Sequence, residues 1–121
     1  MTEYAILIPG DEARWAAASD ADKRAMYDRH NAFAAMLAER GHTITGGAEL
    51  THSSTSRLVR LDGDAALVTD GPYAETTEQL TGFYTVRTDD LDDLLECVAF
   101  LAGGEGPLEV RACVDHSVGQ A

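Results

Sequence analysis

The chain is poor in the features that tie a protein to a membrane, a disulfide framework or a secretion route. It has only two cysteines, Cys97 and Cys113, and they fit neither a Cys-x-x-Cys metal site nor a set of disulfides. We expect both to be small apolar side chains rather than redox groups. No apolar run approaches the roughly 20 residues needed to span a bilayer. The first residues lack the basic segment of a secretion signal, so we expect a cytoplasmic protein.

Positive charge is also scarce. Only 9 lysines and arginines stand against 21 aspartates and glutamates, for a formal net charge of −12. Such a surface repels nucleic acid phosphates and anionic lipids. The chain has no phosphate-binding glycine loop and no dinucleotide fingerprint, and His42, His52 and His116 form no metal-ligand spacing. We therefore expect no nucleic acid or membrane partner, no cofactor and no metal.

What the chain does contain is typical of one small globular domain. Hydrophobic residues make up 45% and charged residues 25% of the 121 residues, so a single domain over residues 1–121 can bury a modest core. Hydrophobic periodicity and turn residues predict two helices and six strands. The helices span 20–40 and 88–102, and the strands span 4–8, 43–50, 56–61, 64–69, 83–87 and 108–114. We expect a loop at 11–19 and a frayed tail over 115–121.

Local signals indicate where these elements begin and end. Four residues of the first helix recur at spacings of three and four on one face, namely Met26, His30, Phe33 and Leu37. Ser19 or Asp20 can cap the start of this helix, and Gly41 follows its last turn. We expect Gly103-Gly104 to end the second helix, and Asp62-Gly63 predicts a hairpin turn.

The order of elements is strand, helix, several antiparallel strands, helix, strand. That order predicts an α+β fold in which two helices pack on one face of a mostly antiparallel sheet. It is similar to the ferredoxin-like fold with an added β-hairpin. Two helices cover only one sheet face, yet strand 83–87 places Phe83 on one face and Tyr84 and Val86 on the other. We therefore expect a second copy of the chain to cover the other face, giving a homodimer.

Residues 68–84 are the most informative segment. An apolar strand ends at Asp70, Gly71-Pro72 forms a stiff turn, and a polar loop with Glu75 and Glu78 leads to the next strand. A carboxylate on the last residue of a strand, braced by such a turn, is held in a fixed position. We expect it to face a cleft.

Residues 70–78, Asp-Gly-Pro-Tyr-Ala-Glu-Thr-Thr-Glu, resemble the signature of the DGPF-domain branch of the YCII-related proteins. That signature reads Asp-Gly-Pro-Phe/Tyr-x-Glu-x-Lys-Glu, so Thr77 stands where relatives often have Lys. The resemblance covers nearly the whole chain, from the first strand to the last. It implies a dimeric α+β barrel with a site built from a His and an Asp. His30, which lies eleven positions before Gly41 as in YCII-like proteins, and Asp70 match these two residues.

A His–Asp pair of this kind is a general acid/base, because the carboxylate orients the imidazole and stabilises its charged form. The predicted catalytic pair is therefore His30 and Asp70. Around it we expect a pocket or loop formed by Gly71, Pro72, Tyr73, Glu75, Glu78 and Tyr84. Two other interpretations stay open. His30 can simply pack on its helix face with one hydrogen bond, and the acidic loop residues can serve solvation rather than bind a divalent cation.

Two functions of different classes follow. The first is a small cofactor-independent enzyme that uses His30 and Asp70 to move a proton on a small organic molecule. The barrel superfamily that the fold resembles includes monooxygenases, isomerases and dechlorinating enzymes, which is an argument from fold alone. The second is a non-catalytic module that binds a small ligand or a regulatory partner. DGPF-type relatives are often associated with extracytoplasmic-function sigma factors, which implies a link to stress pathways.

Overall fold

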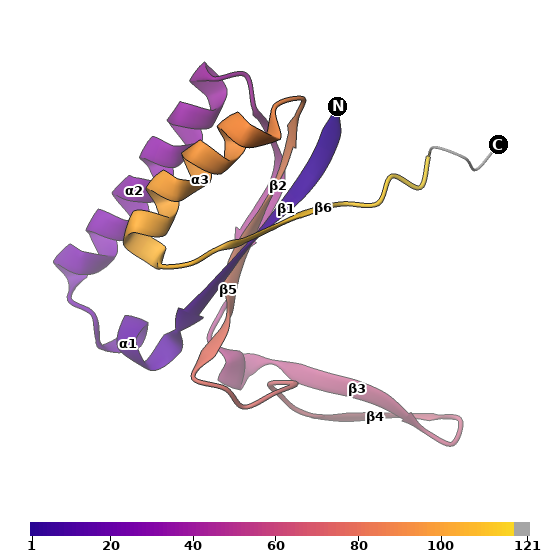
Figure 1. Ribbon diagram of the computed structural model, residues 1–121. Helices are drawn as coiled ribbons and strands as arrows, with labels where there is room; N and C mark the ends of the chain where they lie inside the picture. Colours follow the sequence, from indigo (N-terminus) through magenta and orange to yellow (C-terminus); the bar gives the residue numbers. More distant parts are fainter. Residues whose placement is uncertain (118–121) are drawn as a thin grey trace.

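The computed structural model describes residues 1–117 and has the mixed α+β architecture predicted from the sequence (Figure 1). The elements in chain order are β1 (Thr2–Asp11), α1 (Glu12–Ala17), α2 (Asp20–Glu39), β2 (Thr43–Glu49), the 3-10 turn η1 (Ser53–Thr55), β3 (Arg57–Asp62), β4 (Ala65–Asp70), β5 (Glu78–Thr88), α3 (Leu91–Glu105) and β6 (Glu109–Ala112). The frayed tail predicted for 115–121 falls partly outside the described residues. Within residues 1–117, no helix combines the length and apolarity needed to cross a membrane.

Four strands form the main sheet in the order β2-β5-β1-β6, and every neighbouring pair is antiparallel. Because β5 lies between β1 and β2, the first β-α-β unit is split by an antiparallel strand. Helices α2 and α3 pack side by side on one face of this sheet, as predicted (Figure 1). The core lies between the two layers and consists of Ile6, Ile8, Phe33, Leu37, Val86, Leu94, Cys97, Val98 and Leu101. Phe33 and Leu37 come from the predicted helix face, which is confirmed.

Of two predicted helix boundaries, the start of α2 is confirmed and the end of α3 is wrong. Ser19 caps α2 by accepting a hydrogen bond from the Asp22 amide at 3.0 Å, as predicted. Gly103-Gly104, expected to end the second helix, lie inside α3 instead, and the helix ends at Gly106 with φ of 86°. A Cβ atom on either of the two inner glycines would lie 2.5 Å from an atom of Arg29. Their missing side chains therefore serve close packing of α2 on α3.

The segment 11–19, predicted as a loop, contains the short helix α1. Asp11 ends β1 and caps this helix, because its side chain accepts a hydrogen bond from the Arg14 amide at 3.1 Å. The rings of Trp15 and Tyr27 of α2 meet in a T-shaped arrangement, with the ring centroids 5.8 Å apart. This contact holds α1 to α2 where the chain leaves the sheet.

The second face of the main sheet is left uncovered by residues 1–117 (Figure 1). Side chains on this face alternate with those of the core, so Leu7 of β1 and its partner Phe83 of β5 point to it. Both are half-buried within one chain. Ala5, opposite Thr85, continues the same row. The face thus carries an apolar centre with polar neighbours.

Strands β3 and β4 form a separate two-stranded hairpin that projects away from the main sheet (Figure 1). The predicted hairpin is confirmed, with its turn one residue later, at Gly63-Asp64, where Gly63 has φ of 63°. One face of the hairpin carries Val59, Leu61 and Val68, whose side chains are mostly exposed to solvent. An isolated hairpin is marginally stable in water, so burial of this apolar face against another surface would stabilise it. We call the segment 57–70 the arm.

The close approach of β2 to β5 at Gly47 gives a first prediction. At Gly47 a Cβ atom would lie 2.7 Å from the Phe83 carbonyl oxygen, a backbone atom that cannot move without disturbing the pairing of β2 with β5. We expect Gly47→Ala to lower the free energy of unfolding by about 1–3 kcal/mol, measured by urea denaturation. Gly63→Asn is the control. Gly63 has open space around its Cβ position and Asn tolerates its backbone angles, so a change beyond about 0.5 kcal/mol is not expected there.

Candidate functional site

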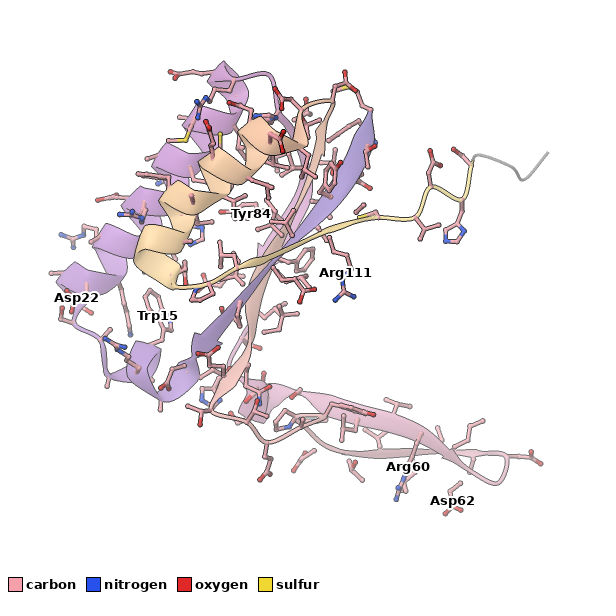
Figure 2. The ribbon with its side chains drawn as sticks, viewed as in Figure 1. Trp15, Asp22, Arg60, Asp62, Tyr84 and Arg111 are labelled. Atoms are coloured by element: carbon pink, nitrogen blue, oxygen red, sulfur yellow. The ribbon has the colours of Figure 1, made fainter. Side chains whose placement is uncertain are left out.

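Side chains from three elements meet at His30 of α2. Its Nδ1 atom lies 2.7 Å from the hydroxyl of Tyr84 on β5, and its Nε2 atom lies 2.7 Å from Oε1 of Glu105, the last residue of α3. Figure 2 shows Tyr84 between the two long helices and the sheet. We call these three residues the His30 triad. Both ring nitrogens are therefore used within one chain.

The types of these groups determine where the protons lie. An ionised carboxylate can only accept hydrogen bonds. Nε2 of His30 therefore carries a hydrogen and donates a hydrogen bond to Glu105. In a neutral ring Nδ1 is then the acceptor, and the Tyr84 hydroxyl donates to it. The rings of His30 and Tyr84 are stacked with centroids 5.8 Å apart, and Phe33 packs against Tyr84 at 5.5 Å. The hydroxyl is therefore well positioned.

Partial burial sets the electrostatics of the triad. The side chains of His30 and Glu105 are 20% and 17% exposed, so the pair is mostly shielded but open to solvent at one side. Burial raises the pKa of Tyr84, and the negative charge of Glu105 raises this pKa further. Tyr84 thus keeps its proton at neutral pH, as a hydrogen-bond donor to Nδ1 must.

The raised pKa of Tyr84 predicts a pH dependence of stability. Because the folded-state pKa lies above the ordinary value of 10.0, the contribution of Tyr84 to stability is complete below pH 10 and is lost as the pH rises through the folded-state pKa. One such group gives a slope of up to about 1.4 kcal/mol per pH unit. We expect Tyr84→Phe to flatten the alkaline loss of stability in urea titrations.

The control for this experiment is Tyr27. Hydrogen bonds to Glu49, followed by partial burial, raise the pKa of Tyr27 as well. The part of the alkaline loss of stability that comes from Tyr27 should persist in Tyr84→Phe and disappear in Tyr27→Phe. An alkaline profile that is the same in Tyr84→Phe as in the parent protein would contradict the assignment.

Asp70 lies elsewhere. It ends β4, its side chain is 86% exposed, and its Oδ1 atom lies 3.6 Å from Nη1 of Arg57, its partner across the arm. The predicted pairing of His30 with Asp70 is therefore not made within one chain. The reason is that β4 belongs to the arm and not to the main sheet, so its end is not at the rim beside α2. Participation of Asp70 in function stays a prediction.

Half of the predicted pocket residues line a different cleft. Gly71, Pro72 and Glu75 border a cleft of about 520 Å³ between the signature loop, the start of α1 and η1. The remaining lining residues are Asp11, Glu12, Ala13, His52, Ser53, Ser54, Thr76, Thr77 and Gln79. Glu78 is exposed and Tyr73 is 94% exposed, and neither lines the cleft. The predicted single site is thus divided between this signature cleft and the His30 triad, which holds Tyr84.

Glu12 is a hydrogen-bonded carboxylate in the signature cleft. Its carboxylate accepts hydrogen bonds from the amide of Ser53 at 2.7 Å and from its hydroxyl at 2.5 Å. Partial burial acts to raise the pKa of Glu12, but the two hydrogen bonds from Ser53 and the nearby His52 outweigh it and keep this pKa below its ordinary value. At Gly71 a Cβ atom would lie 2.6 Å from Oγ of Ser56, so the turn needs glycine. The cleft therefore offers a fixed negative charge suited to donor or cationic groups.

Sequence reasoning missed Glu105 and Glu12. Glu105 lies two residues beyond Gly103, where the second helix was expected to have ended, so nothing placed it on a helix facing His30. Glu12 lay in a predicted loop. The one available signal was Asp11-Glu12 directly after a strand, since a capping residue followed by an acid is typical of a helix start.

The fold and the triad together define a small α+β protein in which a histidine bridges a tyrosine hydroxyl and a carboxylate. A sequence model of the YCII-related domain matches residues 2–104, so the chain belongs to the YCII-related family. An uncharacterised protein of Rhizobium meliloti (strain 1021) is 32% identical over 121 residues, which cover 97% of this chain and 96% of that relative. The resemblance found in the sequence is confirmed.

Proposed function

We propose that the protein is a cofactor-independent enzyme that moves a proton on a small organic molecule, with the His30 triad as its acid/base centre. The single observation that carries this proposal is the continuous chain Tyr84–His30–Glu105, with 2.7 Å at both ring nitrogens. A hydroxyl, an imidazole and a carboxylate in this order form the arrangement by which a base activates a hydroxyl group and a third residue orients the base. Glu105 takes the role that the sequence had suggested for Asp70.

The chemistry follows from the proton positions. When a substrate presents an acidic C–H or O–H group to the Tyr84 oxygen, Nδ1 of His30 accepts the hydroxyl proton and the phenolate oxygen removes the substrate proton. Glu105 stabilises the imidazolium that forms, because its carboxylate accepts a hydrogen bond from Nε2–H and carries the opposite charge. Return of the proton at another position of the substrate completes an isomerisation. The partly exposed side of His30 is the approach for a small molecule.

A homodimer is part of this proposal. The uncovered face with Leu7 and Phe83, together with the apolar face of the arm, supports a second copy packed on the main sheet. The resulting assembly is a ferredoxin-like, dimeric α+β barrel with an added hairpin, of the kind that the family resemblance implies. A stable association of this kind needs a total buried area of about 1,200 Å² or more. A location in the cytoplasm, expected from the sequence, also belongs to the proposal.

The signature cleft favours a second candidate function. A preformed cleft of about 520 Å³ with a fixed carboxylate suits a bound ligand without any chemistry. In that case the protein is a ligand-binding or regulatory module, in line with the sigma-factor and stress association of DGPF-type relatives. The two candidates differ in where a ligand binds. An enzyme substrate contacts Tyr84, whereas a module's ligand contacts Glu12 and Glu75.

The deciding experiment detects proton transfer without knowledge of the product. The full chain is incubated in D2O with a panel of small ketones, keto acids and lactones, and exchange of carbon-bound hydrogen for deuterium is followed by NMR. Thermal shift of the same panel reports binding, because a ligand of the native state raises apparent stability. Exchange above the rate without protein supports the enzyme. Compounds that bind without exchange, and whose binding is weakened by Glu12→Gln, support the module and contradict the enzyme.

A further inference from the structure

A second cluster of reactive side chains lies just beyond the C-terminal end of α2. His42 follows α2, and Asp93 and Cys97 are four residues apart on α3, so both project from the same side of that helix. A ring nitrogen of His42, a carboxylate oxygen of Asp93 and Sγ of Cys97 all lie within 4.8 Å of one another. His42, for which the sequence showed no metal-ligand spacing, therefore joins two potential ligands that are distant from it in the chain.

The cluster is shielded and its histidine is fixed. The side chain of His42 is 1% exposed and Cys97 is fully buried, whereas Asp93 is 26% exposed and opens the cluster to solvent. Nδ1 of His42 lies 2.7 Å from Oγ1 of Thr88, which also accepts the Asp90 amide hydrogen bond at 3.0 Å. An oxygen bonded to one ring nitrogen fixes the orientation of the other nitrogen, which is how metal-binding histidines are usually held.

The cluster already attracts a positive charge. The guanidinium of Arg40 lies with Nη1 3.4 Å from Sγ of Cys97 and Nη2 3.4 Å from Oδ1 of Asp93. The Arg40 side chain is 42% exposed and also lies 3.6 Å from the exposed Glu96, so it can turn outward without losing every partner. In this structure Arg40 supplies the cation that balances Asp93.

From this arrangement we propose that His42, Asp93 and Cys97 form a Zn²⁺ site. Nitrogen, carboxylate oxygen and thiolate sulfur are the ligands that Zn²⁺ takes in proteins, and a thiolate favours Zn²⁺ over Mg²⁺ or Ca²⁺. Three protein ligands leave the fourth tetrahedral position for water, which enters on the exposed side of Asp93. The anionic Asp93 and the thiolate of Cys97 balance the two charges of the ion. The site is separate from both the His30 triad and the signature cleft.

The rearrangement that metal binding requires is small. Ligand atoms about 2.0–2.3 Å from a tetrahedral zinc ion lie about 3.3–3.8 Å from one another. The atoms of this cluster lie within 4.8 Å of one another, so the longest separation needs to shorten by about 1 Å at most. The direct contact of Nε2 with Oδ2 of Asp93, now 2.7 Å, must open as the ion takes the place of the shared proton. Arg40 must swing from Cys97 toward Glu96.

The test is titration of the full chain, freed of metal with a chelator, with Co²⁺ as a spectroscopic substitute for Zn²⁺. We expect one equivalent of Co²⁺ to produce a thiolate-to-metal charge-transfer band and the d–d absorption of tetrahedral cobalt, and Zn²⁺ to abolish both. Cys97→Ser should remove the charge-transfer band, and Cys113→Ser is the matched control that should keep it. A missing band in the parent protein, a band that survives Cys97→Ser, or one lost in Cys113→Ser overturns the proposal.

Two further variants separate ligation from folding, because neither changes a ligand. Thr88→Val removes the hydroxyl that contacts Nδ1 of His42 and should weaken Zn²⁺ affinity about 10–100-fold, measured by chelator competition. Arg40→Gln removes the competing cation and should tighten Zn²⁺ binding several-fold. Metal binding at an unrelated surface site would not become tighter in Arg40→Gln. An unchanged or weaker Zn²⁺ affinity of this variant therefore contradicts the proposal.

Discussion

His30→Asn is expected to lower kcat for proton exchange by about 10²–10⁴-fold, the usual contribution of a positioned acid/base. Asn can still meet the Tyr84 hydroxyl at the position of Nδ1, but it cannot accept its proton. The expected KM changes little, because the proposed substrate contact is the Tyr84 oxygen rather than His30. The measurement is deuterium exchange into whichever panel compound the parent protein turns over, with unfolding curves to verify that the variant remains folded.

Two carboxylate variants make this prediction specific. Glu105→Gln removes the charge that stabilises the imidazolium, so it should lower kcat while leaving substrate binding intact. Asp70→Asn changes the acid that the sequence had paired with His30, and here it contacts Arg57 instead. If Asp70→Asn lowers kcat as much as His30→Asn does, while Glu105→Gln leaves kcat unchanged, the triad is not the acid/base centre.

The fold was predictable where one short signal determines the local structure. The spacing from Met26 to Leu37 and the cap at Ser19 predicted α2, and an Asp-Gly pair predicted the arm's turn to within one residue. The double glycine of α3 led to a wrong helix end because its role is in tertiary packing, which the local sequence does not reveal. In isolation Gly103-Gly104 indicates a helix end, but in the folded chain the pair makes room for Arg29, whose Nε atom donates to the Phe100 carbonyl at 2.9 Å.

The candidate site was predictable only in part. His30 was identified from its position on a helix face and from the family resemblance, and Tyr84 was expected near the signature loop. Glu105 lies 75 residues from His30, and no local pattern marks a carboxylate at the end of a distant helix as its partner. The absence of a His30–Asp70 contact within one chain has the same origin, because the sequence indicates that a strand ends at Asp70 but not which sheet that strand joins.

The same limit applies to the arm. Its two strands were predicted, but only the structure places them outside the main sheet, where Figure 2 shows Arg60 and Asp62 at the end farthest from the helices. The apolar residues Val59, Leu61 and Val68 are 69%, 74% and 55% exposed on one face of the arm. An arm of this composition that stayed free in solution would be prone to pair with other chains. The proposed second copy would remove this hazard by covering both the arm and the open sheet face.

Phe83→Asp is therefore expected to convert the proposed homodimer into a monomer. Phe83 lies at the centre of the open face opposite Leu7, and a two-fold interface would contain the substitution twice. An unpaired carboxylate buried in an interface costs several kcal/mol, so two of them should raise the dimer Kd by more than about 10³-fold, since 1.4 kcal/mol corresponds to a factor of ten. Sedimentation or light scattering at micromolar concentration measures the change.

The control is Leu95→Asp, which places the same charge on the outer side of α3, where Leu95 is 42% exposed within one chain. This variant should stay a dimer, because α3 lies on the sheet face opposite Phe83. Val59→Asp then tests the arm. If it also dissociates the dimer, the arm and the open face belong to one interface; if it does not, the arm packs elsewhere. A parent protein that is monomeric at micromolar concentration would remove the dimer from the proposal while leaving the triad chemistry, which lies within one chain, unaffected.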